Sequence, residues 1–471
     1  MNDDVEVLDI DDELIIKKDI KETKEVKKDL KEDKEGLEVK MKKTKKRVKK
    51  TVKRKLEVIF CSISALFILG CIIFYGYRFV KYYRIYNPKI DSSSSGVFLA
   101  NYITGKSEYA TGGEDGLFSS SGNYIYKGNV TNNYLKYNNM LWRIVRINSD
   151  KSIDIILDDY INVLPWNNNV RKFKESDIFK YLNNEFLNNL DKSMLTENSF
   201  CTDEINDLTK ITCNNQNDDN YVKLLDVTNF LNSINNSKSY LVKEDEIFWL
   251  SDIDTDKVWH TNSVNVSESD PSTFYEIKPM VRLKETNLYV EGDGTKNSPY
   301  TLKSDNNVTI GSVIELGKDK WIVYNKDDNN TKLMHKDLLE KQIEFDKEKL
   351  TYDESSLMKY LNDEYLNSLS YKDLLINDTW YIGEYKDSLY DVKNTNVKTK
   401  VGVPNILDIK FDSSILGYFT STINEERVLV YENPLRPSRV TTYRSIRPCI
   451  SLSNNTINKL KYSDGVYKLG E

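Results

Sequence analysis

Hydrophobic and polar positions follow three different patterns along the 471-residue chain. Residues 58–77, VIFCSISALFILGCIIFYGY, contain no charged side chain. Residues 141–147 alternate apolar and polar side chains around Trp142, and residues 178–190 place an apolar side chain at every fourth position. These patterns predict, in turn, a membrane-spanning helix, a β-strand and an amphipathic helix.

The uncharged run has the length of a bilayer. Twenty helical residues rise about 30 Å, which matches the hydrocarbon thickness. Residues 40–55 hold eleven Lys or Arg and no acid, and such a basic excess lies on the cytoplasmic side of a span. The leader is too long for a removable signal peptide and no small-residue cleavage site follows. We therefore expect a single-pass type II protein of the plasma membrane, with its span at 56–79 and its C-terminal part outside.

The segments that flank the predicted span are polar. Residues 1–55 mix acids and lysines and are expected to be a disordered cytoplasmic tail that touches membrane lipid. Within it, residues 4–16 (DVEVLDIDDELII) form either a strand-like motif for a cytoplasmic partner or a soluble stretch with chance apolar residues. Residues 80–128 are rich in Ser and Gly and are predicted to be a stalk, with the packed part beginning near Val130.

Several fragments beyond residue 128 occur twice in the same order. YLNNEFLNNL at 181–190 and YLNDEYLNSL at 360–369 share seven of ten positions. The other pairs are 138–157 with 318–334, 246–254 with 417–424, and 277–283 with 446–452. We therefore predict two tandem copies of an α+β domain, at 129–303 and 308–470, each with an opening hairpin, one helix and closing strands.

A recurring amphipathic helix explains why the fragments at 181–190 and 360–369 are so similar. Ile178, Leu182, Phe186 and Leu190 form an apolar face that packs on a sheet. The second copy repeats this face with Leu357, Leu361, Tyr365 and Leu369. The intervening Asn and acidic residues are expected to face water.

These landmarks resemble an uncharacterised domain family of surface proteins in low-GC Gram-positive bacteria. The resemblance covers roughly residues 95–469 and rests on WRIVRIN at 142–148, LNNEFL at 182–187, FWLS at 248–251, IKPMVRL at 277–283 and GDGTKNSPY at 292–300. The second copy is more divergent, since Trp321 is not followed by Arg and the tail is reduced to SDGVYKL. The resemblance implies a surface location and no chemistry. A C-type-lectin-like arrangement is expected by analogy of fold alone.

The sequence predicts no catalytic, metal or cofactor site. Glu185 and Glu364 recur on the helix but are interpreted as solvated carboxylates rather than general acids. His260 is interpreted as an ordinary surface histidine, and GDGT as a tight turn rather than a calcium loop. No known nucleophile, zinc or phosphate-binding motif occurs.

Three cysteines lie beyond the predicted span. Cys201 and Cys213 either form a disulfide, which would stabilise the fold by on the order of 3 kcal/mol, or remain as two free thiols. The second copy has no matching cysteine, so the bridge is not essential to the fold. Cys449 replaces Met280 in a closing strand and is expected to be a buried, inert thiol.

Arginines concentrate near the C-terminus. The predicted anion-binding patch consists of Arg427, Arg436, Arg439, Arg444 and Arg447 with Tyr431 and Tyr443. Guanidinium groups bind carboxylate and phosphate oxygens in bidentate geometry. The alternative is a set of scattered surface arginines paired with nearby acids.

The expected function is a non-enzymatic binding or adhesion module that recognises an anionic wall polymer, a glycan or a protein. A transmembrane sensor or envelope-assembly component with a cytoplasmic partner is the alternative, and an unrecognised cell-wall enzyme is the weakest reading. Nucleic acid is not expected as a partner because residues 56–471 carry a net charge of about −10, given −6 for the whole chain and +4 for residues 1–55.

Overall fold

The computed structural model separates the chain into two units, Met1–Ser95 and Gly96–Glu471. The described residues are 96–167, 172–201, 204–211, 216–304, 307–412, 414–433 and 435–469, with 49–50, 62, 64, 68–72 and 74–76 in the first unit. Residues 4–16 and most of the predicted span at 56–79 therefore lie outside the described part.

The described residues between 62 and 76 are helical. Several of their apolar side chains, including Ile68, Ile72 and Phe74, are exposed. Among the described residues, no helix has the length and apolar character needed to cross a bilayer.

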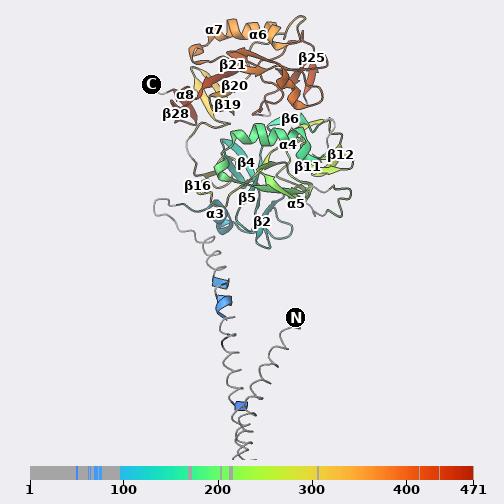
Figure 1. Ribbon diagram of the computed structural model, residues 1–471, viewed down its shortest axis with the longest axis vertical. Coiled ribbons are helices and arrows are strands. Elements are labelled where there is room, and N and C mark those ends of the chain that lie inside the picture. Colours follow the sequence, from blue (N-terminus) through green and yellow to red (C-terminus); the bar gives the residue numbers. More distant parts are fainter. Residues whose placement is uncertain are drawn as a thin grey trace, which may run out of the picture. The chain divides into compact units, whose positions relative to one another are not determined.

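The second unit is rich in strands and contains sheets in two regions (Figure 1). The elements of the first region are α3 (Leu99–Lys106), β1 (Gly116–Ser120), β2 (Asn123–Lys127), β3 (Tyr134–Tyr137), β4 (Met140–Ile147), β5 (Ile153–Leu157), β6 (Asn162–Pro165), η1 (Phe173–Glu175), α4 (Asp177–Lys180), η2 (Tyr181–Phe186), η3 (Leu187–Asn189), η4 (Lys192–Met194), β7 (Leu195–Thr196), β8 (Asn198–Cys201), β9 (Gln216–Asn220), β10 (Val222–Lys223), α5 (Val227–Asn232), β11 (Trp249–Asp254), β12 (Lys257–Asn262), β13 (Asn265–Ser269), β14 (Phe274–Ile277), β15 (Met280–Leu283), β16 (Tyr289–Glu291) and β17 (Tyr300–Leu302).

The elements of the second region are β18 (Val313–Leu316), β19 (Asp319–Lys326), β20 (Asn330–His335), η5 (Tyr352–Glu354), α6 (Ser356–Tyr360), η6 (Leu361–Tyr365), α7 (Leu366–Ser368), η7 (Lys372–Leu374), β21 (Asp378–Tyr381), η8 (Leu389–Asn394), β22 (Asn396–Thr399), β23 (Val401–Gly402), β24 (Tyr418–Asn424), β25 (Arg427–Tyr431), β26 (Arg436–Ser438), β27 (Cys449–Ser453), α8 (Asn454–Ile457), β28 (Leu460–Ser463) and β29 (Val466–Leu469). The predicted α+β class is confirmed.

The main sheets of the two regions share a strand order. The first runs β10-β15-β5-β4-β3-β17-β16, and the second runs β23-β27-β20-β19-β18-β29-β28. In both, the strand that carries the tryptophan is central and the last strand but one pairs in parallel, as β17 with β3 and β29 with β18. Three further strands, β1, β2 and β7, extend the first sheet.

The smaller sheets also correspond. Strands β11-β12-β13 and β24-β25-β26 form three-stranded sheets. The register shifts within the first strand of each, between Trp249 and Ile253 and between Phe419 and Ile423. Such an irregularity at one place in both sheets is a feature of the backbone rather than a local defect.

The predicted opening hairpins are confirmed. Strands β4 and β5 pair antiparallel, and the amide of Lys151 donates to the carbonyl of Asn148 at the turn between them. Strands β19 and β20 pair in the same way.

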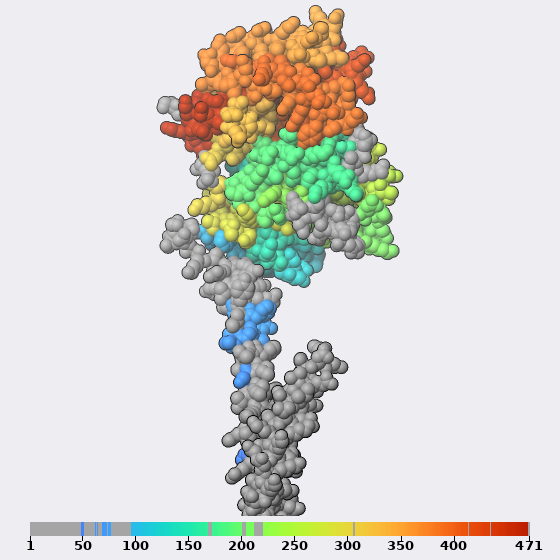
Figure 2. All heavy atoms as spheres, in the orientation of Figure 1, coloured from blue at the N-terminus to red at the C-terminus, as the bar shows by residue number. Residues whose placement is uncertain are grey.

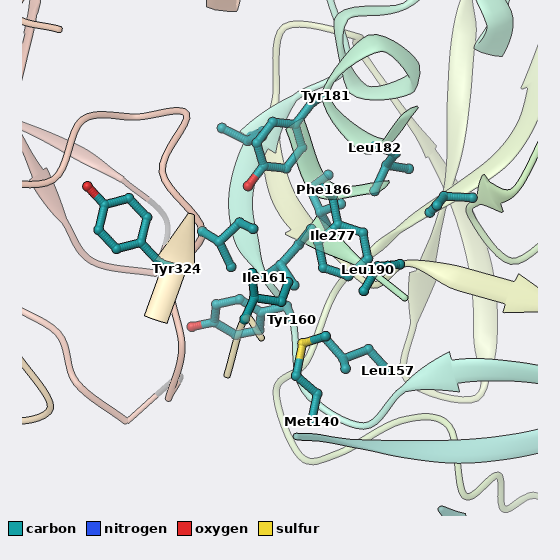
Figure 3. Packing of buried hydrophobic residues seen from close by; sticks show 14 of the residues in the cluster. Met140, Leu157, Tyr160, Ile161, Tyr181, Leu182, Phe186, Leu190, Ile277 and Tyr324 are labelled. Carbon is teal, nitrogen blue, oxygen red and sulfur yellow. The ribbon is translucent and has the colours of Figure 1, made fainter. Parts of the chain in front are cut away.

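The recurring helix is irregular in both regions. It begins as α4 or α6 and continues through the π-helical segments η2 and η6. It ends in the 3-10 segment η3 in the first region and in the α-helical segment α7 in the second. Tyr181, Leu182 and Phe186 are buried and point toward the side chains around Ile161 and Ile277 (Figure 3). The predicted apolar face is therefore present.

The prediction that the intervening asparagines face water is wrong at Asn183 and Asn362. The Asn183 amide donates to the carbonyls of Phe179 and Val222, at 3.1 and 3.0 Å, and accepts from the Val222 amide. Asn362 makes the matching bonds to Met358 and Val401. These side chains bond the edge strands β10 and β23, which would otherwise present unpaired backbone groups.

The predicted stalk is too long. Leu99, Ala100 and Ile103 of α3 are buried, and β2 pairs with β4 of the main sheet. The compact unit begins at Gly96 rather than near Val130, because Ser121 and Gly122 form the turn of the hairpin β1–β2.

The buried apolar residues of the second unit form one hydrophobic cluster that includes members of both regions. Trp142 and Trp321 are completely buried within it. Figure 3 shows part of this cluster, with Tyr160 and Ile161 from the first region and Tyr324 from the second. The two regions therefore share a core.

Candidate functional site

The predicted anion patch is divided between the interior and the surface. Arg447 is 0% exposed, and its guanidinium donates to the carbonyls of His335, Phe411 and Lys336. Tyr431 is also buried. A ligand in solution does not reach either side chain, so the patch as predicted is wrong at these two positions.

The other members of the patch lie nearer the surface. Arg436 and Arg444 both contact the carboxylate of Glu432, at 3.4 and 3.1 Å. Arg427, Arg439 and Tyr443 are exposed. One carboxylate therefore offsets two of the four accessible arginines, which weakens this segment as an anion site.

Lys278 occupies the place of Arg447 in the first region. It is 2% exposed and donates to the Glu246 carboxylate at 3.0 Å and to the carbonyls of Asp158 and Leu241. Both cations thus hold the closing strand in the interior. They stabilise the fold and do not contact an external ligand.

The recurring helix carboxylates do not form a common site. Glu185 contacts Lys393 at 2.5 Å, whereas Glu364 is exposed beside Lys341 at 3.1 Å. His260 is buried, which corrects the expectation of a surface histidine. Its Nδ1 lies 2.8 Å from the Thr261 carbonyl, and burial lowers its pKa.

Two cysteine predictions have different outcomes. Cys449 is buried, and burial raises the pKa of its thiol, as expected for an inert core position. The backbone of Cys201 pairs with Gln216, but Cys213 lies outside the described residues. The disulfide stays a prediction.

The GDGT segment is a tight turn, as predicted. The Asp293 carboxylate accepts from the amide and hydroxyl of Thr295, and Gly292 and Gly294 have positive φ. No group of three or more metal-ligating side chains occurs in the part of the chain that the structure describes.

A polar crevice lies where the two regions meet, and we call it the junction crevice. Its main cavity is about 350 Å³ and a second cavity of about 180 Å³ adjoins it. Both are lined by Asp191, Asn307, Thr309 and Tyr467. Figure 2 shows the hairpin β28–β29 in red beside the yellow segment that opens the second region.

The turn between β3 and β4 positions one wall of the junction crevice. Asn138 and Asn139 both have positive φ, 52° and 55°, as a two-residue hairpin turn requires. Asn138 bonds the end of the helical segment at Asn189, and Asn139 bonds Thr309 and Ser312 of the second region. The wall is therefore held by side chains of both regions.

A second crevice lies at the equivalent place in the first region, and we call it the amino-terminal crevice. Its volume is about 660 Å³. Its lining includes Asn129-Val130-Thr131 and Tyr300, whereas the junction crevice contains Asn307-Val308-Thr309 and Tyr467. Tyr300 and Tyr467 occupy matching positions, because each is the first paired residue of the parallel strand.

The recurring Asn-Val-Thr triplet is a signal that the sequence reasoning missed. It precedes the central-strand tryptophan of each region, Trp142 and Trp321, yet neither triplet matches a known catalytic motif. The crevices themselves depend on chain segments far apart in sequence, such as 188–191 with 457–467. No local pattern in the sequence reveals that these segments come together.

The crevices differ in charge. The amino-terminal crevice is lined by Glu108, Glu114, Asp115 and Asp293 against Lys106. Hydrogen bonds from Thr111 lower the pKa of Glu114, and hydrogen bonds from Thr295 lower that of Asp293. In the junction crevice, the ammonium group of Lys326 donates to the Val308 carbonyl at 3.2 Å.

Groups with pKa values shifted toward neutrality lie in the interior. Burial raises the pKa of Asp252 to about 7 and that of Glu276 to about 8, and it lowers the pKa of Lys410 to about 8. None of the three lines either crevice. They are therefore not placed to transfer protons to a ligand bound there.

No protein-family model, curated protein or solved structure matches the chain. The resemblance to the surface-protein domain family stays a prediction.

Proposed function

We propose that the protein is a membrane-anchored, non-enzymatic binding module that presents two tandem copies of one α+β domain outside the cell. The observation that carries the binding function is the recurrence of a polar crevice at the same place in both regions. The ligand is an envelope or host polymer.

Several matched features support the tandem duplication. The main sheets share one strand order, and Asn183 and Asn362 anchor the same edge strand in each. Lys278 and Arg447 fill the same interior position. Unrelated domains would not share a strand order, a helix anchor and a buried cation at once.

The chemistry of the crevices supports binding over catalysis. Beside their charged side chains, both linings hold amides, hydroxyls and tyrosines, and a few such polar groups fix the orientation of a ligand. The strongly shifted acids, which an enzyme would place in its cleft, are interior in this protein.

The uncharged run at 58–77 and the basic run before it support a plasma-membrane anchor with a cytoplasmic N-terminus. The exposed apolar side chains of Ile68, Leu69 and Phe74 are consistent with a lipid environment.

The test uses cells that display the full chain. Protease added outside should release fragments of 96–471 and leave the tail protected. The displayed chain should also retain a fluorescent polymer from a panel of envelope and host polymers, and a chain truncated after residue 95 should not. Complete protection from protease, or equal retention by the truncated chain, would contradict the proposal.

A further inference from the structure

We propose that the two crevices bind a neutral saccharide chain. This inference rests on the proposed binding function and names the chemical class of its ligand. Sugars present apolar ring faces and hydroxyl groups that both donate and accept. A site for them therefore needs an aromatic surface beside groups that can do both.

Each crevice has a tyrosine at an accessible position. Tyr462 lines the junction crevice and is 50% exposed, with its ring centroid 5.0 Å from that of Tyr467. Tyr109 lines the amino-terminal crevice, is 43% exposed and stacks on Tyr124 at 5.5 Å. The neighbouring ring holds each tyrosine, so each offers a pre-formed platform for a sugar face.

Amide side chains lie close to each platform. Asn307 and Asn458 are exposed on the walls of the junction crevice, and Asn129 and Asn132 are exposed on those of the other. A carboxamide donates two hydrogen bonds and accepts two. A carboxamide therefore suits a pair of sugar hydroxyl groups. A carboxylate only accepts hydrogen bonds and an ammonium group only donates them, so each matches such a pair less well.

The charges of the crevices disfavour an anionic ligand. Four carboxylates and one lysine line the amino-terminal crevice, so a phosphate or uronate chain would be repelled there. The equivalent positions of the two crevices favour one ligand class for both. A neutral chain is the class that both accept.

The presence of two crevices in one compact unit predicts bivalent binding of long chains. When one crevice is occupied, the second encounter becomes intramolecular, and avidity exceeds single-site affinity by about 10²–10⁴. A short oligosaccharide occupies each crevice separately and gains no such enhancement.

The experiment measures binding to the full chain in nanodiscs. The probes are fluorescent tetramers of glucose and of N-acetylglucosamine, the corresponding long chains, and poly(glycerol phosphate) as the anionic chain. The variants are Tyr462→Ala, Tyr109→Ala and Asn458→Ala. Tyr443→Ala is the matched control, because Tyr443 is 64% exposed and lines neither crevice.

The wild-type chain and Tyr443→Ala should retain a neutral chain. Tyr462→Ala and Tyr109→Ala should each weaken the binding of long chains at least tenfold and remove about half of the binding sites for the tetramer. Asn458→Ala should weaken binding without altering the unfolding midpoint. Crevice variants that bind like the control would overturn the inference. Retention of poly(glycerol phosphate) alone would also overturn the saccharide inference but leave the proposed binding function intact. If neither this experiment nor the displayed-cell panel shows retention of any probe, both the inference and the proposed function are contradicted.

Discussion

At the residue scale, the interior holds more charge than the composition suggests. From its sequence context Arg447 is expected in a surface patch, since cations are rarely buried, but Arg447 and its counterpart Lys278 both lie in the interior. They are buried because backbone carbonyls from distant segments converge on them. Only three-dimensional proximity brings those carbonyls together, so the sequence does not reveal the role of these side chains.

Replacement of Lys278 by Ala should destabilise the second unit by about 3–5 kcal/mol, because the carboxylate of Glu246 would remain buried without its partner. Lys278→Arg should cost much less, since the second region accepts a guanidinium at this position. Urea unfolding of the full chain measures both. Exposed Arg427→Ala is the control, expected within about 0.5 kcal/mol of wild type, and a loss below 1 kcal/mol for Lys278→Ala would contradict the argument.

Glu276 predicts a dependence of stability on pH. Burial and the nearby Glu246 raise its pKa from 4.5 to about 8, and its Oε2 has no hydrogen-bond partner among the described residues. Because the folded pKa exceeds the unfolded one, its stabilising contribution is complete below pH 4.5 and is lost as the pH rises to 8. The loss is on the order of 5 kcal/mol at most.

The variant Glu276→Gln carries no proton to lose and should remove this component of the pH profile. The difference in unfolding free energy between variant and wild type, measured from pH 4 to 9, should grow steadily up to pH 8 in favour of the variant. Asp252, whose pKa is also raised, contributes equally to the pH dependence of both proteins, so its contribution cancels in the difference. A constant difference across this range would show that Glu276 titrates normally.

At the element scale, patterns local in sequence were sufficient for the strands and the helix. Alternation located β4 and β19, and four-residue spacing located the buried face that begins at Ile178. The π-helical segments and the anchoring role of Asn183 were not predictable in this way. The anchor of Asn183 depends on Val222 in an edge strand, 39 residues farther along the chain.

Asn183→Ala should release the helical segment from β10, because it removes bonds to both backbone groups of Val222. The expected cost is about 1–3 kcal/mol, the price of leaving buried polar groups unpaired. Hydrogen exchange at the Val222 amide should accelerate. Asn184→Ala, at the exposed neighbouring position of the same helix, is the control; equal effects of the two variants would argue against the anchor.

At the scale of the whole molecule, the repeated fragments predicted two separate domains, yet the regions share one hydrophobic cluster. Polar contacts also join them. The Asn162 amide donates to the carbonyls of Ile406 and Asp408, at 2.7 and 3.2 Å. The carboxylate of Asp177 accepts from the hydroxyl of Ser388 and the amide of Leu389. These contacts lie far apart in sequence, so the repeat pattern does not reveal them.

A shared core makes the two regions unfold together, since neither keeps its full burial without the other. Calorimetry of the full chain should therefore give a single main transition for the second unit. The double variant Asn162→Ala, Asp177→Ala leaves the core of each region intact but removes four of the hydrogen bonds that join them, so the transition should broaden toward two. Exposed Asp363→Ala should not broaden it. Two transitions in the wild-type chain would mean that the regions fold independently, and the junction crevice would then lack a fixed wall.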